Sequence, residues 1–104
     1  MAKAASVEVK TGYGAVRGTE IGGVRTFRGI PFAAPPVGAR RLAAPERPAP
    51  WEGVLDATTS GAACVQPTGL MPGQEEAIFS TLFGPGKLPM SEDCLYLNVF
   101  APAG

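Results

Sequence analysis

The segment Ser91–Pro102, with the sequence SEDCLYLNVFAP, decides how the rest of this chain is interpreted. Within it, Leu95–Phe100 is a short run of apolar, aromatic and β-branched residues, which is typical of a β-strand. Little in this run alternates with polar residues, so both faces of the strand need cover, as in the centre of a larger sheet. Pro102 is expected to end the strand, because proline has no N–H for the ladder. No other part of the 104 residues could cover both faces, so the strand indicates a larger protein.

The composition argues against several classes of function. The formal net charge is zero, and acidic and basic residues are evenly mixed, which gives no electrostatic basis for binding nucleic acid or an anionic membrane surface. No apolar run approaches the ~18 residues of a membrane span. The first residues, MAKAAS, form no apolar leader, which favours a cytoplasmic location, whereas a cysteine pair would suit a secreted protein.

The sequence also lacks the residues of the common catalytic and metal sites. There is no histidine, so the chain has neither a Cys/His zinc site nor a histidine-based triad. None of its serines stands in a Gly-x-Ser-x-Gly elbow. We therefore expect no catalytic residue, no metal and no cofactor in these 104 residues.

Three alternating segments near the N-terminus predict an antiparallel β meander. They are residues 7–10, 15–18 and 24–28, and they are separated by the turn signals Thr11–Gly14 and Gly22-Gly23. Period-two alternation places one set of side chains on a common face. The candidates for that packed face are Val7, Val9, Val16, Val24 and Phe27.

Glycine (14) and proline (11) make up about a quarter of the chain and recur through the residues beyond the meander. Residues 29–38 (GIPFAAPPVG) are expected to be irregular backbone held by the packing of Ile30 and Phe32. Their interleaved apolar residues favour a packed segment over a Pro-rich recognition motif. Trp51 is expected to cover the edge of a core, with its indole N–H on a backbone carbonyl.

Cys64 and Cys94 enclose a long loop in which residues 74–83 (QEEAIFSTLF) show the spacing of a helical turn or two. A disulfide closing a loop of this size would stabilise the fold by about 3 kcal/mol in the chain-entropy model. Two thiols acting as small apolar side chains are the alternative. The spacing of the two cysteines is compatible with both alternatives. The absence of an apolar leader in the first residues favours free thiols, whereas the long loop that the bond would close favours a disulfide.

Several stretches, taken in order, resemble the N-terminal part of one enzyme family. They are residues 27–38 (FRGIPFAAPPVG), Arg41, Trp51–Gly53, Cys64–Gln66 and Ser91–Phe100. The family is that of the type-B carboxylesterases, which includes cholinesterases and bacterial para-nitrobenzyl esterases. The resemblance implies an α/β-hydrolase fold, of which residues 1–104 would be a partial domain. That part would comprise the antiparallel meander, the irregular Pro/Gly-rich segment, the Cys-bounded loop and the first long strand of the central sheet.

The resemblance also implies roles for particular residues. Family members carry a disulfide at the positions of Cys64 and Cys94, around a loop that forms part of the active-site gorge wall. Cholinesterases have an ion pair whose partners match Arg41 and Glu92, which the residues alone would identify as solvated charges. Within the loop, the candidates for contact with the acyl or alcohol group are Phe79, Leu82 and Phe83, and inward packing under the loop is the alternative.

For the complete protein, the resemblance implies hydrolysis of a small carboxylic ester through an acyl-serine intermediate. The oxyanion turn, serine elbow, acid and histidine of the family lie beyond the position of Gly104. We therefore expect the chain alone to be inactive and to need the remainder of the hydrolase domain as its partner. The alternatives are a non-catalytic, cholinesterase-like adhesion or binding protein and an inactive truncated fragment. A Gly-x-Ser-x-Gly motif downstream would separate the esterase from the adhesion protein.

Two departures from the family pattern bear on the substrate and the packing. The loop tryptophan that stacks on choline in cholinesterases falls at Gly84, and glycine has no π face, which argues against a choline ester. The family usually has phenylalanine where Leu42 stands, a change expected to cost little in packing.

Overall fold

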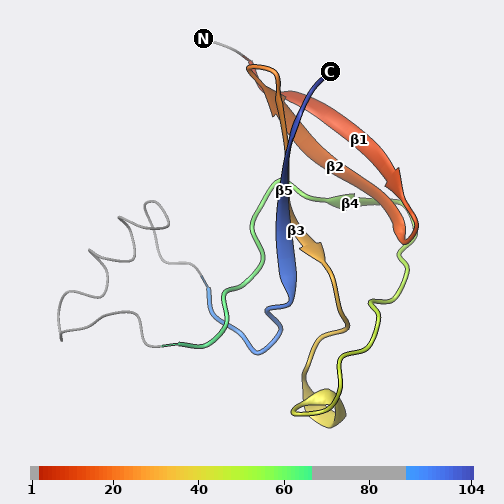
Figure 1. The fold of residues 1–104 in the computed structure, drawn as a ribbon, viewed down its shortest axis with the longest axis vertical. Coiled ribbons are helices and arrows are strands. Elements are labelled where there is room, and N and C mark those ends of the chain that lie inside the picture. The colour runs from red at the N-terminus through yellow and green to blue at the C-terminus, as the bar shows by residue number, and fades with distance from the viewer. Residues whose placement is uncertain (1–2, 67–88) are drawn as a thin grey trace, which may run out of the picture.

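The computed structural model describes residues 3–66 and 89–104, whose backbone forms one sheet with irregular connections (Figure 1). β1 (Ala5–Thr11), β2 (Gly14–Ile21) and β3 (Val24–Pro31) pair successively in antiparallel fashion. This confirms the predicted meander. The two-residue turn between β2 and β3 depends on Gly22 and Gly23, whose φ angles of 59° and 81° are those of a hairpin turn that matches the strand twist.

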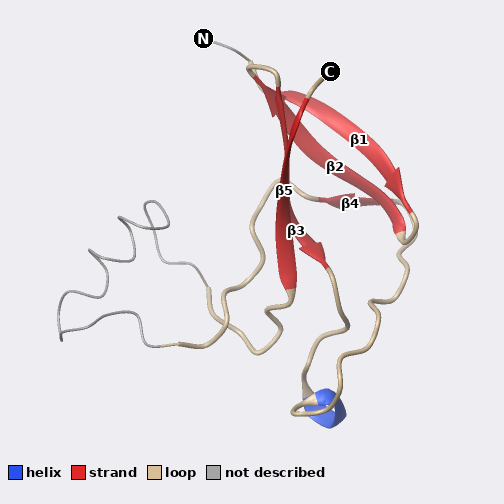
Figure 2. Ribbon diagram, viewed as in Figure 1, coloured by secondary structure: helices blue, strands red, loops and turns tan. Residues whose placement is uncertain are grey.

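β4 (Val54–Asp56) enters the sheet beside β2 after the long Pro-rich excursion (Figure 2). It pairs in parallel with the first half of β2, whereas β3 pairs with the second half of that same edge. Ala57, directly after β4, accepts a hydrogen bond from Arg28 N and donates one to Arg17 O, each 2.7 Å long. The backbone at Ala57 therefore fills the gap where β2 and β3 diverge.

β5 (Tyr96–Pro102) pairs antiparallel with the other edge of β3, so the start of β1 and the end of β5 lie at the same end of the sheet (Figure 1). β5 ends at Pro102, as predicted, but the proline is the last residue of the strand and does not stop the pairing before it. Pro102 pairs with Val24, and Ala103 N then donates to Gly23 O at 2.9 Å. Proline is tolerated here because β5 ends the sheet order and no strand among the described residues requires its missing N–H.

The register of β3 against β5 shifts between Phe27 and Ile30. Gly29, inside this irregularity, has a φ of 74°, and its N–H is satisfied by the side-chain oxygen of Asn98 on β5 at 3.1 Å. An unpaired backbone donor at this point would carry a free-energy cost, so the asparagine compensates for the interrupted ladder.

The packed core of the described residues is small and lies where β2, β3 and the segment after β4 meet. Val16, Phe27 and Ala57 are buried, and partly buried side chains surround them: Val7, Ile30, Trp51 and Leu55. The indole N–H of Trp51 donates to Ala15 O at 2.8 Å, which confirms the contact predicted for it. Val16 and Phe27 thus match the predicted packed face, and Val7 borders it.

Three residues expected to pack are exposed instead. Val9 is on β1, the strand that begins the sheet order, and no described element covers it. Val24 stands at the Gly22-Gly23 turn, and Phe32 lies just after β3 at the start of the excursion. Among the described residues, none of these three side chains belongs to the packed cluster around Phe27.

The excursion between β3 and β4 carries one short 3₁₀ helix, η1 (Gly38–Arg40), at its far point (Figure 2). The rest is irregular, as the prolines predict, and Ala34 N bonds to Glu46 O at 3.0 Å to bring the two limbs together. In residues 3–66 and 89–104, no helix has the length and apolar character that crossing a membrane requires.

β5 presents apolar side chains on both of its faces. Leu97 is 40% exposed, Val99 39% and Phe100 60%. Arg28 places its guanidinium 5.3 Å from the centre of the Phe100 ring, within the range of a cation–π contact. Within the described residues, then, neither face of β5 has the cover that its sequence requires.

Candidate functional site: the cysteine pair at the start of β5

The two ends of the Cys-bounded loop are held together by backbone hydrogen bonds. Ala63 N donates to Pro89 O at 2.9 Å, and Ser91 N donates to Ala63 O at 3.0 Å. Ala63 and Met90 form an isolated parallel bridge between the two chain segments. The backbone therefore brings Cys64 and Cys94 into register without a covalent bond between them.

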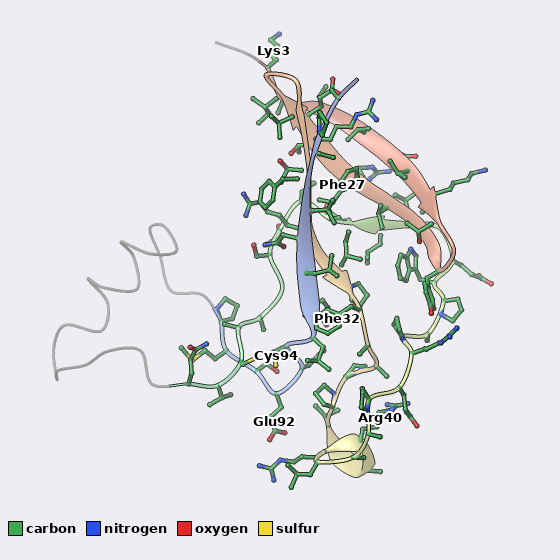
Figure 3. The ribbon with its side chains drawn as sticks, in the orientation of Figure 1. Lys3, Phe27, Phe32, Arg40, Glu92 and Cys94 are labelled. Atoms are coloured by element: carbon green, nitrogen blue, oxygen red, sulfur yellow. The ribbon has the colours of Figure 1, made fainter. Side chains whose placement is uncertain are left out.

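Cys64 and Cys94 are free thiols whose Sγ atoms lie 2.8 Å apart, with Cys64 exposed and Cys94 partly buried. Cys94 lies on the stretch that leads into β5, as Figure 3 shows together with Glu92. The hydrogen bond to Cys64, partial burial, the charge of a Cys64 thiolate and the charge of Asp93 raise the pKa of Cys94 to about 11. Cys94 therefore holds its proton at neutral pH.

A carboxylate and a phenol fix the backbone around Cys94. Tyr96 Oη donates to Asp93, with both carboxylate oxygens at 3.0 Å, and Asp93 N donates to Ser91 Oγ at 3.1 Å. Burial, followed by its bond to Asp93, raises the pKa of Tyr96, so the phenol keeps its proton. These contacts connect Ser91, Asp93 and Tyr96 at the start of β5 and place the Asp93 carboxylate next to Cys94.

Arg41 and Glu92 lie together, with Arg41 Nε 2.9 Å from Glu92 Oε1. The contact joins the end of the η1 segment to the stretch before β5. Both side chains are largely solvent-accessible, at 65% and 51% exposure. An ion pair in this environment is screened by water and contributes little to stability.

We expect a coupling energy of at most about 1 kcal/mol between Arg41 and Glu92. The measurement is a double-mutant cycle on the complete protein with Arg41→Gln, Glu92→Gln and the double variant, using denaturant unfolding. Arg40 and Glu46, a second exposed ion pair, provide the matched control cycle. A coupling above about 3 kcal/mol would contradict the expectation and would be typical of a buried pair.

Other predicted site residues are not placed by the structure. Phe79, Leu82 and Phe83, the helical segment 74–83 and Gly84 all lie outside the described residues. Leu42 is described, and it is almost fully exposed, with a φ of 63°. In the part of the chain that the structure describes, no three His, Cys, Asp or Glu side chains gather as metal ligands would.

Sequence reasoning missed two elements of this region. Asn98 was included in an apolar run, although a lone polar residue in such a run signals a side chain with a specific partner, which here is Gly29 N. Asp93 was identified only as one of two carboxylates before the strand, and its bond to Tyr96 was not predicted. The spacing Asp93-x-x-Tyr96 carries no general signal for this contact.

Comparison with known proteins gives the family directly. The model of the carboxylesterase family matches residues 5–104. The chain belongs to the carboxylesterase family. It is 50% identical over 95 residues to the para-nitrobenzyl esterase of Bacillus subtilis, covering 90% of this chain and 17% of that protein. It is 48% identical over 88 residues to a cocaine esterase of Oryctolagus cuniculus, covering 85% of this chain and 16% of that protein.

Solved structures give the same result. A PNB esterase matches with a TM-score of 0.78 and 47% identity, covering 93% of this chain and 18% of that one. A Geobacillus stearothermophilus carboxylesterase matches with a TM-score of 0.68 and 38% identity, covering 91% and 16%. The chain thus spans about a sixth of the length of these carboxylesterases. The architecture that it shares with them is of the α/β-hydrolase type, here represented by a sheet that is antiparallel except for the pairing of β4 with β2.

Proposed function

We propose that these residues are the N-terminal part of a serine carboxylic-ester hydrolase that acts through an acyl-enzyme. The observation that carries the proposal is the 50% identity to a para-nitrobenzyl esterase over 90% of this chain. In the complete enzyme, a serine attacks the ester carbonyl, a histidine moves the proton, and backbone N–H groups hold the oxyanion. The substrate would be a small carboxylic ester.

In this proposal the chain supplies scaffold and no reacting group. It contains no histidine and no Gly-x-Ser-x-Gly motif. β5 would be the first long strand of the central sheet, and the rest of the domain would cover its exposed Leu97, Val99 and Phe100. The loop between Cys64 and Cys94 would form part of the gorge wall, with Phe79, Leu82 and Phe83 as the residues proposed to meet the substrate.

We expect the complete protein to hydrolyse para-nitrophenyl acetate and the 104-residue chain alone to show no turnover above buffer. Release of para-nitrophenolate, followed by absorbance, measures both. Adding the remainder of the domain as a separate polypeptide should restore activity if the two associate. The matched control is the remainder alone, which should be inactive without β5.

A fluorophosphonate probe that labels activated serines gives an independent test. After labelling of the complete protein and peptide mapping, the modified serine should lie in a Gly-x-Ser-x-Gly sequence. Ser6, Ser60, Ser80 and Ser91 should carry no label. A label on one of those four serines would overturn the assignment. Absence of both label and turnover in the complete protein would instead identify the adhesion or binding alternative.

A further inference from the structure

β1 begins the sheet order, and among the described residues its only neighbouring strand is β2 (Figure 1). The backbone groups of alternate β1 residues therefore point away from the sheet. Two hydrogen bonds on the far side of β2 show which residues these are. Ala57 N donates to Arg17 O, and the indole N–H of Trp51 donates to Ala15 O. The carbonyl groups of Arg17 and Ala15 thus point away from β1.

The register of β1 against β2 transfers this alternation to β1. Glu8 lies opposite Arg17, and Lys10 lies opposite Ala15. In an antiparallel pair, two residues opposite each other either bond to each other through their backbones or both point outward. The N–H and C=O groups of Glu8 and Lys10 therefore point to the open edge of β1, whereas those of Val9 pair with β2. All three side chains are solvent-exposed.

We propose that the open edge of β1 binds the same edge of a second copy of this chain, in antiparallel fashion about a twofold axis at Val9. In this register Glu8 lies opposite Lys10 of the partner subunit, and the two residues exchange backbone hydrogen bonds. Val9 lies opposite Val9 of the partner subunit. The result would be one continuous sheet through both copies, with the same surface used on each side.

The charges on β1 select this register from its neighbours. Centring the pair on Glu8 places two glutamates opposite each other, and centring it on Lys10 places two lysines opposite each other. Like charges in such positions destabilise a cross-strand pair, whereas opposite charges stabilise it. Centring it on Val7 places Glu8 opposite Ser6 of the partner subunit, which gains no charge pair. Only the register centred on Val9 among these pairs every acidic side chain with a basic one.

The ion pairs already present on β1 are compatible with this contact. Glu8 Oε1 accepts from Arg17 Nη2 at 2.9 Å, and the side chains of both residues are about half exposed. In the described part of the chain, Lys10 has no ion-pair partner. The incoming Lys10 of the partner subunit would therefore join an existing Arg17–Glu8 pair, and the carboxylate would face a cation on each side.

The same register covers an apolar side chain that is exposed in a single copy. Val9 lies opposite Val16, a buried core residue, so Val9 extends the apolar face of the sheet toward the open edge. Two Val9 side chains would meet in a pair without direct backbone bonds, where side chains approach most closely. Because the contact involves one short strand from each copy, we expect a weak dimer with a Kd of about 10–100 µM.

Sedimentation velocity of the complete protein, from about 1 to 200 µM, tests the proposal. We expect a concentration-dependent dimer. Lys10→Glu and Glu8→Lys should each raise its Kd at least about tenfold, because each variant places like charges opposite each other. The matched control is Arg40→Glu, a charge reversal in η1, which should leave the Kd unchanged.

Mixing the two variants gives the sharper test. In an equimolar mixture of Lys10→Glu and Glu8→Lys, every cross-strand pair between unlike chains again joins opposite charges, so association should return. Because this recovery requires both variants to be folded, it also shows that unfolding did not cause the loss.

Three results would each overturn the proposal: a complete protein that stays monomeric over the whole range, a dimer that neither variant weakens, or a mixture that does not associate. A monomer would mean that the charges of Glu8 and Lys10 protect the edge from pairing. None of these readouts depends on ester hydrolysis, so the dimer and the proposed function can fail separately.

Discussion

Phe27→Ala is expected to lower the free energy of unfolding of the complete protein by about 3–5 kcal/mol. Phe27 is the largest of the buried core side chains, and its ring packs against β2 at Gly18, where an added Cβ would meet the ring at 2.6 Å. Removing the ring leaves a cavity between β2, β3 and Ala57. The rigid backbone pairing on both sides limits how far that cavity can collapse.

Denaturant unfolding of the complete protein measures the effect of Phe27→Ala, with Leu42→Ala as the control. Leu42 is apolar but 98% exposed, so its truncation should change stability by less than about 0.5 kcal/mol. A loss below about 1 kcal/mol for Phe27→Ala would mean that this cluster is not the packed centre of the sheet.

Gly29→Ala is expected to lower the free energy of unfolding by about 2–5 kcal/mol, for two separable reasons. The φ of 74° is one that L-residues rarely adopt, which accounts for about 1–2 kcal/mol. A Cβ would also stand 2.6 Å from Thr59 O and 3.2 Å from Gly61 N, both backbone atoms. Relief of that clash would separate β3 from the segment after β4 and weaken the Gly29–Asn98 hydrogen bond, at a further cost of about 1–3 kcal/mol.

Two other glycines separate these contributions. Gly22 has a φ of 59° but open space around it, so Gly22→Ala should show the backbone strain alone. Gly18 is not in the left-handed region, but its Cβ would meet Thr26 O at 2.3 Å, so Gly18→Ala should show the clash alone. Gly29→Ala should exceed Gly22→Ala in the same unfolding experiment. Equal losses would mean that the close approach of Thr59 to Gly29 is absent in solution.

The local elements could be predicted from the sequence, because their determinants are local. Period-two alternation and the Gly22-Gly23 pair were enough to predict β1, β2 and β3. A partly buried indole N–H needs a hydrogen-bond acceptor, so a bond to a nearby backbone carbonyl could be predicted. The indole N–H of Trp51 donates to Ala15 O. The apolar run Leu95–Phe100 predicted β5, which begins one residue later and continues to Pro102.

The way in which the strands are combined could not be predicted, because it depends on contacts between distant residues. The sequence of Val54–Asp56 carries no signal for a parallel strand that pairs with β2 where β2 and β3 diverge. Ala57 is buried because of that insertion, and an alanine after a short strand has no distinctive sequence signal. The shift in β3 depends on the pairing of Gly29 with Asn98, which is visible only once the register is known.

The candidate site followed from the family resemblance more than from the residues. Residue chemistry did not decide whether Cys64 and Cys94 are free thiols or form a disulfide. The structure shows that the two sulfur atoms are close together and that Cys64 is more exposed than Cys94. Residue chemistry alone predicted that Arg41 and Glu92 are separate, solvated surface charges. In the structure they form an ion pair, and both side chains are solvent-accessible. The disulfide, the gorge-lining role of Phe79, Leu82 and Phe83, and the limits of the partial domain stay predictions.

The pairing of β3 with β5 joins residues that are far apart in the chain, and Gly29 and Asn98 are separated by 69 positions. Closing so long a loop lowers the chain entropy before any stabilising contact forms. Pairing of β3 with β5 should therefore be slow compared with formation of the β1–β2 and β2–β3 hairpins. During synthesis on the ribosome, the edge of β3 that pairs with β5 would stay unpaired until β5 leaves the exit tunnel. That interval is when a nascent chain of this kind would most need protection by a chaperone.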